Sequence, residues 1–306
     1  MNGVLIIDKP AGLTSHDVVN RVRRILGEKS VGHLGTLDPM ATGVLPLVAG
    51  HLTRLAQFYM GSEKTYEGII RFGFATDTYD AEGEPTNSPS ESRPALGAVR
   101  ECAHRFVGFI EQTPPPFSAK KIDGVPAYKR ARKKQEVVLQ PVRVEVKTLE
   151  IVAMEGDCAS FRAHVASGTY IRSIAHELGQ ALGCGAHLAA LRRTRVNEFT
   201  LADARTLDQL QMALQSGQSE EIFIHPRKLL PEMPSVTVTE EAIGHIRCGR
   251  SLNLPELSRA KRVKVFRSQR DLIAIATRVA GTLFHPGIVF LQMQAPMEGV
   301  AVPAHN

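Results

Sequence analysis

The sequence predicts an α+β protein with a large N-terminal domain and a small β-rich C-terminal domain. Segments in which apolar and polar residues alternate predict half-buried strands, and segments with apolar residues at helical spacing predict helices among them. The chain of 306 residues is long enough for one large core and a second, smaller one. The pattern changes after 231–235, which we interpret as a linker, so we place the domains at 1–230 and 235–295.

The N-terminal domain is predicted to begin with a short buried strand at 4–8. Ser15 is predicted to cap the helix that follows, because Val18, Val22 and Leu26 fall on one helical face. The elements expected next along the chain are a helix at 53–60, a strand at 66–74, a surface loop at 80–94 and an amphipathic helix at 96–107.

The second half of this domain combines alternating strands with one further helix. Residues 142–146 and 161–165 alternate between apolar and polar side chains, which predicts two strands with one buried face each. Apolar residues at helical spacing then predict a helix that ends at Gly183. Tyr170 and Arg172 therefore stand at a strand-to-helix junction, where side chains can point into a cleft.

The C-terminal domain is predicted to contain short strands around a single helix. The segments expected are strands at 236–238, 263–266, 272–277 and 288–291 and a helix at 241–247. This length and pattern are typical of a small β-rich module.

One aspartate, Asp38, stands in a segment of unusual composition. Residues 32–46 contain three glycines and two prolines, which predict a shaped loop in place of a regular helix or strand. Asp38 is the only acid in this segment, which argues against a paired acid/base or ion-binding site and favours a carboxylate that acts alone, as a nucleophile can. The alternative from residue types alone is a turn aspartate that bonds its own backbone.

Composition excludes several classes of protein. No stretch approaches about 18 consecutive apolar residues, and the N-terminus lacks the pattern of a signal peptide, so we expect a cytoplasmic protein without a membrane partner. No cysteine belongs to a Cys-x-x-Cys pair, and Gln180 stands where a zincin motif beginning at His176 would need its second histidine. Phosphate-binding and dinucleotide-binding glycine motifs are absent as well, so no metal or cofactor is expected.

The charge of the chain permits a polyanionic partner. The net charge is +6 and the pI is about 9.2. Basic residues cluster at 120–134 and at 247–270, and Arg192, Arg193 and Arg195 form a third group. Separate basic clusters indicate a long track for nucleic-acid phosphates, and the alternative for each cluster is a solvated charged surface.

The segment Gly-His-x-Gly-Thr-Leu-Asp-Pro-x-Ala-Thr-Gly-Val-Leu at 32–45 resembles the signature loop of the bacterial tRNA pseudouridine-55 synthases, the TruB family. Further segments resemble that family in the same order, so the similarity covers most of residues 1–200. These segments are 8–15, 64–66, 76–83, 115–121 and 168–173.

The resemblance implies a fold and an activity. The fold would be that of the pseudouridine synthases, a mainly antiparallel mixed sheet flanked by helices with a central RNA-binding cleft at 1–230, followed by a PUA-like RNA-binding domain at 235–295. The activity would be the isomerisation of uridine 55 in the T loop of tRNAs to pseudouridine. This reaction needs neither redox chemistry nor net hydrolysis, so no cofactor or metal is implied.

The resemblance also assigns catalytic roles. Asp38 matches the catalytic aspartate, which would attack the ribose C1′ or act there as a base, and attack on C6 of the base also remains open. Tyr66 matches a tyrosine that stacks on the flipped-out uridine and reaches its C5 proton. Arg172 matches an arginine that would keep the enclosed carboxylate charged and oriented.

Six further residues are implied to bind the substrate. His33 would fill the gap that the flipped nucleotide leaves, Tyr170 would support Arg172 or the base pocket, and Leu191 would line that pocket. The basic residues of this set are Lys9, Lys64 and Lys120. Phe117 departs from the family, whose members often have tyrosine before Ser-Ala-Lys, and this removes one hydroxyl donor.

The expected partner is the T arm of tRNA, with no required protein partner and a monomeric chain. One alternative is a guide-RNA-dependent synthase of the dyskerin type, which would have terminal extensions and obligate protein partners. The chain begins almost directly at its first strand and has no basic tail, which favours action alone. The other alternative is a tRNA-binding chaperone without catalysis, which would not need a carboxylate beside phosphates.

Overall fold

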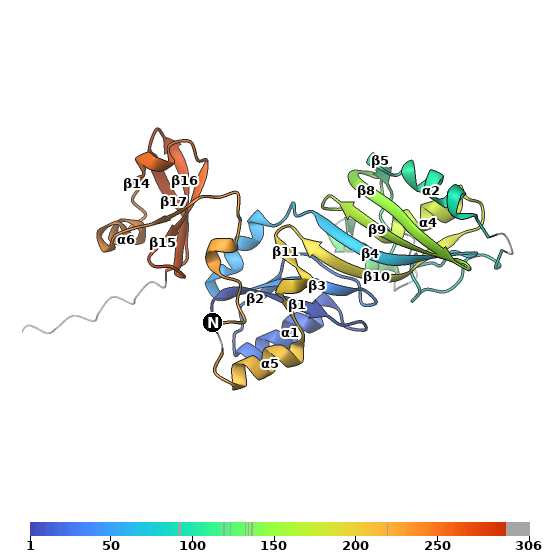
Figure 1. Cartoon of the computed structure of the whole chain (residues 1–306), viewed down its shortest axis with the longest axis horizontal. Helices are drawn as coiled ribbons and strands as arrows, with labels where there is room; N and C mark the ends of the chain where they lie inside the picture. Colours follow the sequence, from blue (N-terminus) through green and yellow to red (C-terminus); the bar gives the residue numbers. More distant parts are fainter. Residues whose placement is uncertain are drawn as a thin grey trace, which may run out of the picture. The chain divides into compact units, whose positions relative to one another are not determined.

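The computed structural model describes residues 1–291 except 91, 92, 119, 123, 132, 134, 136 and 219. The chain divides into two compact units, an N-terminal unit formed by Gly3–Phe223 and a C-terminal unit that begins at Ile224. Figure 1 colours the N-terminal unit from blue through green to yellow and the strands of the C-terminal unit in orange and red.

Within the described residues, the N-terminal unit is built on one sheet of ten strands. They are β1 (Gly3–Lys9), β2 (Val31–His33), β3 (Thr42–Ala49), β4 (Lys64–Phe72), β5 (Gly108–Gln112), β8 (Val142–Glu155), β9 (Cys158–Val165), β10 (Ala186–Val196), β11 (Phe199–Thr200) and β12 (Ala204–Arg205). The main order is β12-β1-β3-β10-β4-β9-β8-β5, with β2 on β3 and β11 on β10. Only β1–β12 and β3–β10 are parallel among these described pairs, which confirms the predicted mainly antiparallel mixed sheet.

Helices cover this sheet in two groups. The helical segments are α1 (Ser15–Leu26), η1 (Gly50–Phe58), α2 (Leu96–His104), α3 (Ala127–Ala131), α4 (Ile171–Ala181), η2 (Leu201–Asp203) and α5 (Leu207–Gln215), and β6 (Lys121–Ile122) pairs with β7 (Val125–Pro126). Helices α1 and α5 lie side by side near β1–β3, whereas α4 packs on β10 and α2 on β8 (Figure 1). Val22 of α1 and Leu178 of α4 both belong to the same large apolar core.

The residue that caps helix α1 lies one position earlier than the sequence predicts. Thr14 is the N-cap, and its side chain and that of Asp17 form a capping box. The prediction that Ser15 caps this helix is therefore wrong. Its buried hydroxyl instead bonds the backbone of Leu37, accepting from N at 2.8 Å and donating to O at 3.0 Å.

The predicted loop at 32–46 is shorter than expected. Strand β2 includes Gly32 and His33, and β3 begins at Thr42, so the irregular segment is confined to 34–41. Pro46 lies within β3 and donates no hydrogen bond, but its carbonyl accepts one from the N–H of Leu34, at 2.9 Å.

The C-terminal unit is β-rich, as predicted. Its elements are η3 (Pro226–Lys228), β13 (Ser235–Thr237), α6 (Glu240–Arg247), β14 (Leu252–Asn253), η4 (Pro255–Leu257), β15 (Arg262–Phe266), β16 (Leu272–Ala280) and β17 (Leu283–Val289). The five strands described here follow the order β13-β15-β16-β17-β14 and enclose a separate apolar core that includes Ile246 and Phe284. None of the helices in the described part of the chain has the length and apolar character needed to cross a membrane.

Candidate active site

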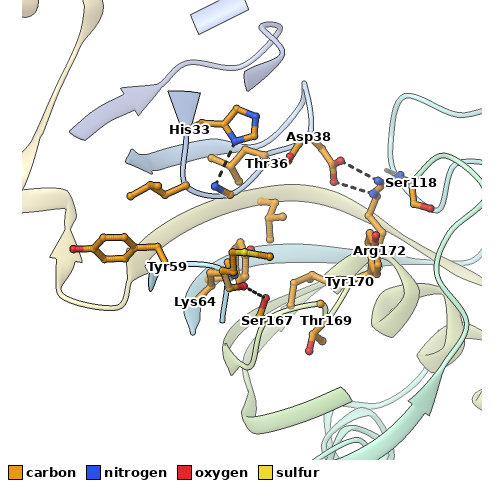
Figure 2. Close-up of a pocket in the computed structure, with 18 of the residues that line it drawn as sticks. His33, Thr36, Asp38, Tyr59, Lys64, Ser118, Ser167, Thr169, Tyr170 and Arg172 are labelled. Atoms are coloured by element: carbon orange, nitrogen blue, oxygen red, sulfur yellow. Dashed lines mark hydrogen bonds and ion pairs between the residues drawn. The ribbon is translucent and has the colours of Figure 1, made fainter. Parts of the chain in front are cut away.

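A cavity of about 460 Å³ lies in the N-terminal unit, within the size range of small-ligand sites. The segment after β2, the end of η1, the first residues of β4, the residues before α4 and Leu191 of β10 contribute to its wall. Figure 2 shows side chains from these segments converging on the cavity. The predicted site residues that line it are His33, Asp38, Lys64, Tyr66, Tyr170, Arg172 and Leu191.

Asp38 and Arg172 form a two-point ion pair at this cavity (Figure 2). The guanidinium meets one carboxylate oxygen through Nη2 and the other through Nε, both at 2.9 Å. The Arg172 side chain is 5% exposed, whereas that of Asp38 is 32% exposed. A guanidinium that contacts both carboxylate oxygens fixes the carboxylate in one orientation, and Asp38 remains open to a ligand.

Arg172 is itself fixed by groups that the sequence analysis did not identify. Its Nη1 donates to the carbonyl of Thr78 at 3.0 Å and lies 3.4 Å from a carboxylate oxygen of Asp80, and its Nη2 donates to the carbonyl of Phe117 at 3.0 Å. Asp80 is 3% exposed. The guanidinium therefore lies between two carboxylates, and its orientation is determined before any ligand arrives.

The loop that carries Asp38 is supported from within by Arg193. This side chain is 0% exposed and donates to the carbonyls of Gly35, Thr36 and Val44 at 2.8 to 3.1 Å. At Gly43 a Cβ atom would lie 2.2 Å from the Arg193 carbonyl oxygen, so only glycine permits this approach of β3 to β10.

These contacts correct the interpretation of the third basic group. Arg193 is internal, and Arg192 pairs with both carboxylate oxygens of Asp8, at 2.8 and 3.1 Å. The exposed Arg195 donates to the carbonyl of Asn197. The sequence could not separate these cases, because Arg192 and Arg193 point to opposite faces of the strand and a register shift lies between Arg193 and Arg195.

Lys9 and Lys120 are the predicted site residues that do not line the cavity. Lys9 is 0% exposed, and its ammonium donates to the carbonyls of Pro10, Leu13 and Pro39 at 2.6 to 3.0 Å. It thus ties the β1–α1 connection to the end of the Asp38 loop. Lys120 is exposed beside β6.

Two tyrosines line the cavity from different elements. Tyr66 on β4 is 7% exposed, and burial raises the pKa of its hydroxyl. Tyr170 is the N-cap residue of α4, and burial also raises its pKa. The buried Gln112 amide bonds both backbone groups of Tyr170, accepting from N at 2.8 Å and donating to O at 3.1 Å. This contact fixes where α4 begins and therefore where Arg172 stands.

Lys64 and His33 add two titratable groups to the cavity wall. Lys64 donates to the carbonyl of Ser62 at 2.6 Å, and burial, followed by repulsion from Arg193, lowers its pKa to about 8. Burial likewise lowers the pKa of His33, so its ring is neutral at pH 7. The His33 Nδ1 atom accepts from the N–H of Gly35 at 3.4 Å. In the described part of the chain no group of three or more His, Cys, Asp and Glu residues is placed to bind a metal ion.

Two family models match this chain in succession. The N-terminal domain of the TruB family pseudouridylate synthases matches residues 23–171, and the C-terminal domain of tRNA pseudouridylate synthase B matches residues 172–233. The first match begins within α1 and the second ends before β13, so together the models cover residues 23–233.

Curated relatives match over nearly the whole chain. The tRNA pseudouridine synthase B of Solibacter usitatus is 50% identical over 94% of this chain and 100% of its own length. The protein of the same name from Arthrobacter sp. is 40% identical over 95% of this chain and 97% of its own length. The Aquifex aeolicus protein, also of that name, is 38% identical over 92% of this chain and 98% of its own.

Solved structures support the same fold at lower identity. Cbf5 in an archaeal box H/ACA sRNP complex with Nop10 has a TM-score of 0.67 and 27% identity, covering 94% of this chain and 86% of that one. Cbf5 in a complex with Nop10 and Gar1 has a TM-score of 0.69 and 26% identity, covering 94% and 85%. The higher identity to the curated synthases favours the main interpretation over the dyskerin-type alternative.

The matches over most of the chain confirm the predicted resemblance and the predicted isomerase. The chain belongs to the TruB family of pseudouridylate synthases, which isomerise uridine to pseudouridine.

Proposed function

We propose that this enzyme acts on tRNA and converts uridine 55 in the T loop to pseudouridine. The names of the curated relatives support tRNA as the substrate. The observation that carries the proposed chemistry is the two-point ion pair of Asp38 with Arg172 at the wall of the cavity.

Asp38 is the catalytic carboxylate in this proposal. The target uridine flips out of the RNA, and the carboxylate attacks C1′ of its ribose, or removes a ribose proton there, while the C1′–N1 bond breaks. The detached uracil turns, and C5 bonds to C1′ as the Asp38–C1′ bond breaks or as the removed ribose proton returns. The C5 proton then leaves, and N1 takes up a proton. Arg172 keeps Asp38 ionised in a site that the substrate closes to water, where desolvation alone would favour the neutral acid.

Tyr66 and Leu191 hold the base in this proposal. The Tyr66 ring offers a stacking surface, and its hydroxyl reaches the C5 proton. Tyr170 closes the pocket from the start of α4. His33, which burial keeps neutral, occupies the space that the flipped nucleotide leaves in the RNA.

Lys64 contacts a phosphate of the substrate in this proposal. It lines the cavity with Asp38 and donates to the carbonyl of Ser62, and an ammonium has three N–H groups, so further donors are left for an anion. The nearby Arg193 guanidinium donates to three carbonyls and supports the loop.

The two predicted domains have separate roles in this proposal. Residues 1–230 carry catalysis, and residues 235–295 form a PUA-like domain that binds RNA through exposed basic side chains. The enzyme works as a monomer in the cytoplasm without a protein partner.

Release of tritium from C5-labelled uridine in a T-arm transcript tests the proposed function. We expect one tritium per transcript from the wild-type chain, and none from a transcript with cytidine at position 55. Asp38→Asn should bind the transcript and release no tritium, whereas Asp208→Asn, which changes an exposed acid on α5, should behave as wild type. Equal release from the cytidine-55 transcript would contradict the assignment of the position, and release by Asp38→Asn would contradict the role of the carboxylate.

A further inference from the structure

Tyr79 adopts a backbone conformation that is unfavourable for a large side chain. Its φ angle is 66°, in the left-handed region that glycine and asparagine adopt far more readily. The backbone on both sides is bound, because the N–H of Tyr79 donates to Thr76 at 3.3 Å and its carbonyl accepts from the N–H of Leu188 at 3.0 Å. Strained positions of this kind persist where the surroundings hold them, and they concentrate at functional sites.

The Tyr79 side chain stacks on His176 of α4. The ring centroids are 3.7 Å apart and the ring planes meet at 11°. Burial lowers the pKa of His176, so the imidazole is neutral at pH 7. Its Nδ1 atom is buried and has no hydrogen-bond partner among the residues that the structure describes, so no hydrogen bond from this atom orients the ring, whereas the stack contacts its face.

The residues on either side of Tyr79 hold Arg172. The Thr78 carbonyl accepts from Arg172, and Asp80 pairs with the same guanidinium. A short hydrogen bond of 2.6 Å joins the Thr78 hydroxyl to the Asp80 carboxylate. Arg172 and His176 are four residues apart on α4 and therefore lie on the same face of that helix.

Segment 78–80 and α4 are thus joined at two points, by the ring stack and by the contacts to Arg172. Segment 78–80 contacts the Nη1 atom of the guanidinium, whereas Asp38 contacts Nη2 and Nε. A shift or rotation of segment 78–80 relative to α4 would move the Thr78 carbonyl and the Asp80 carboxylate together. Arg172 would then lose the geometry of its ion pair with Asp38.

We propose that Tyr79 and His176 are positioning residues that align Arg172, and through it Asp38, for catalysis. This inference rests on the proposed function, because the alignment matters only if Asp38 carries the reaction. It differs from a general stabilising role in predicting an effect on the chemical step with RNA binding retained.

Variants that remove a ring but tolerate the native backbone conformation test this proposal. Tyr79→Asn keeps a residue that tolerates the left-handed conformation but removes the ring. His176→Ala removes the other ring at a half-buried helix position where alanine favours the helix. Tyr79→Phe and His176→Phe retain aromatic surfaces, and His104→Ala on the exposed end of α2 is a matched control.

We expect Tyr79→Asn and His176→Ala each to lower the single-turnover rate by about 10- to 100-fold, because small misplacements of catalytic groups have effects of this size. The Kd for the T-arm transcript should stay within about twofold of wild type, and the double variant should be no slower than the slower single variant. The two Phe variants and His104→Ala should retain the wild-type rate. Thermal unfolding followed by circular dichroism verifies that each variant is folded.

Three results would overturn the proposal. The first is a wild-type single-turnover rate in folded His176→Ala. The second is a weaker Kd for the transcript with an unchanged rate. The third is a double variant whose fold-loss in rate equals the product of the two single losses. His176→Ala supplies the test by itself if Tyr79→Asn does not fold. A wild-type chain without turnover refutes the proposed function, whereas an active wild type with unaffected variants refutes only this inference.

Discussion

The basic side chains near the Asp38 loop and those of the C-terminal unit have the same charge but different surroundings. In the N-terminal unit Arg172 and Arg193 are buried and bind carbonyls or carboxylates of the protein. In the C-terminal unit the cluster at 247–270 is exposed except for Lys264, which donates to the carbonyls of Arg227 and Leu229 at 3.0 and 2.5 Å. A buried cation organises the protein around itself, whereas an exposed one is available to RNA.

This difference in surroundings predicts that a substitution of the buried Arg172 has the largest effect, a loss of catalytic rate. Lysine keeps the charge but cannot contact both Asp38 oxygens while it also donates to the carbonyls of Thr78 and Phe117. We expect Arg172→Lys to lower the single-turnover rate by about 100- to 1,000-fold, as loss of one preorganised electrostatic group does in other enzymes. The measurement is tritium release with enzyme in excess over the T-arm transcript.

Arg100→Lys is the matched control for this prediction. Arg100 also donates to two backbone carbonyls, those of Ile151 and Val152, but it lies on α2 away from the cavity. The single-turnover rate of Arg100→Lys should equal that of wild type. A rate for Arg172→Lys close to that of this control would show that charge alone suffices at the site.

The second effect is on stability. Arg193→Met preserves length but leaves three carbonyls without their donor, so the free energy of unfolding should fall by about 3 kcal/mol or more. All five tyrosines lie in the N-terminal unit and the chain has no tryptophan, so tyrosine fluorescence during urea unfolding reports on that unit. Arg21→Met, at an exposed position on α1 in the same unit, should change stability by less than about 0.5 kcal/mol. Similar transitions for both variants would contradict the internal role of Arg193.

The third effect is a pH dependence of RNA affinity. Because the pKa of Lys64 is lowered to about 8, its ammonium loses its proton as the pH rises through 8, and a phosphate bound there loses its counter-charge. We therefore expect affinity to be highest below pH 8 and to fall by roughly tenfold above it, with Lys64→Met weak at every pH. Filter binding of the T-arm transcript between pH 6.5 and about 9 measures this. An unchanged pH profile in Lys64→Met would assign the titration to another group.

The smallest effect concerns the exposed basic residues of the C-terminal unit. A variant with Arg247, Arg250, Arg259 and Lys261 changed to Gln should show a shallower dependence of log K on log salt, by about one unit for each lost phosphate contact. Lys264→Met should leave that slope unchanged, because this ammonium is occupied inside the unit. Equal slopes for the wild type and the four-residue variant would make this cluster a solvated surface.

Residues on short motifs were predictable from the sequence, but their long-range partners were not. Asp38 and Arg172 stand in segments whose composition or resemblance marks them, and they line one cavity. Asp80 contacts Arg172 across 92 positions of the chain, and no local pattern encodes that pairing. Arg193 was grouped with exposed arginines because charge counts contain no information on burial.

Strands β3 and β10, in the centre of the sheet, were not predicted from the sequence. Strand β3 is buried along nearly its whole length, so it lacks the alternation that identifies a half-exposed strand. Strand β10 pairs with β4 through register shifts between Leu188 and Ala190 and between Arg193 and Arg195, which interrupt its alternation. The half-exposed strands β8 and β9 alternate, and they were predicted in part.

The ammonium of Lys9 occupies the position that a bound sodium or potassium ion would take among carbonyl oxygens. Because the ammonium is covalently attached to the chain, dilution cannot remove it from the β1–α1 connection, whose carbonyls it binds. Its burial also hides it from amine-reactive reagents while the N-terminal unit is closed. Labelling of Lys9, against a background of readily labelled surface lysines, therefore reports how often the support of the Asp38 loop opens.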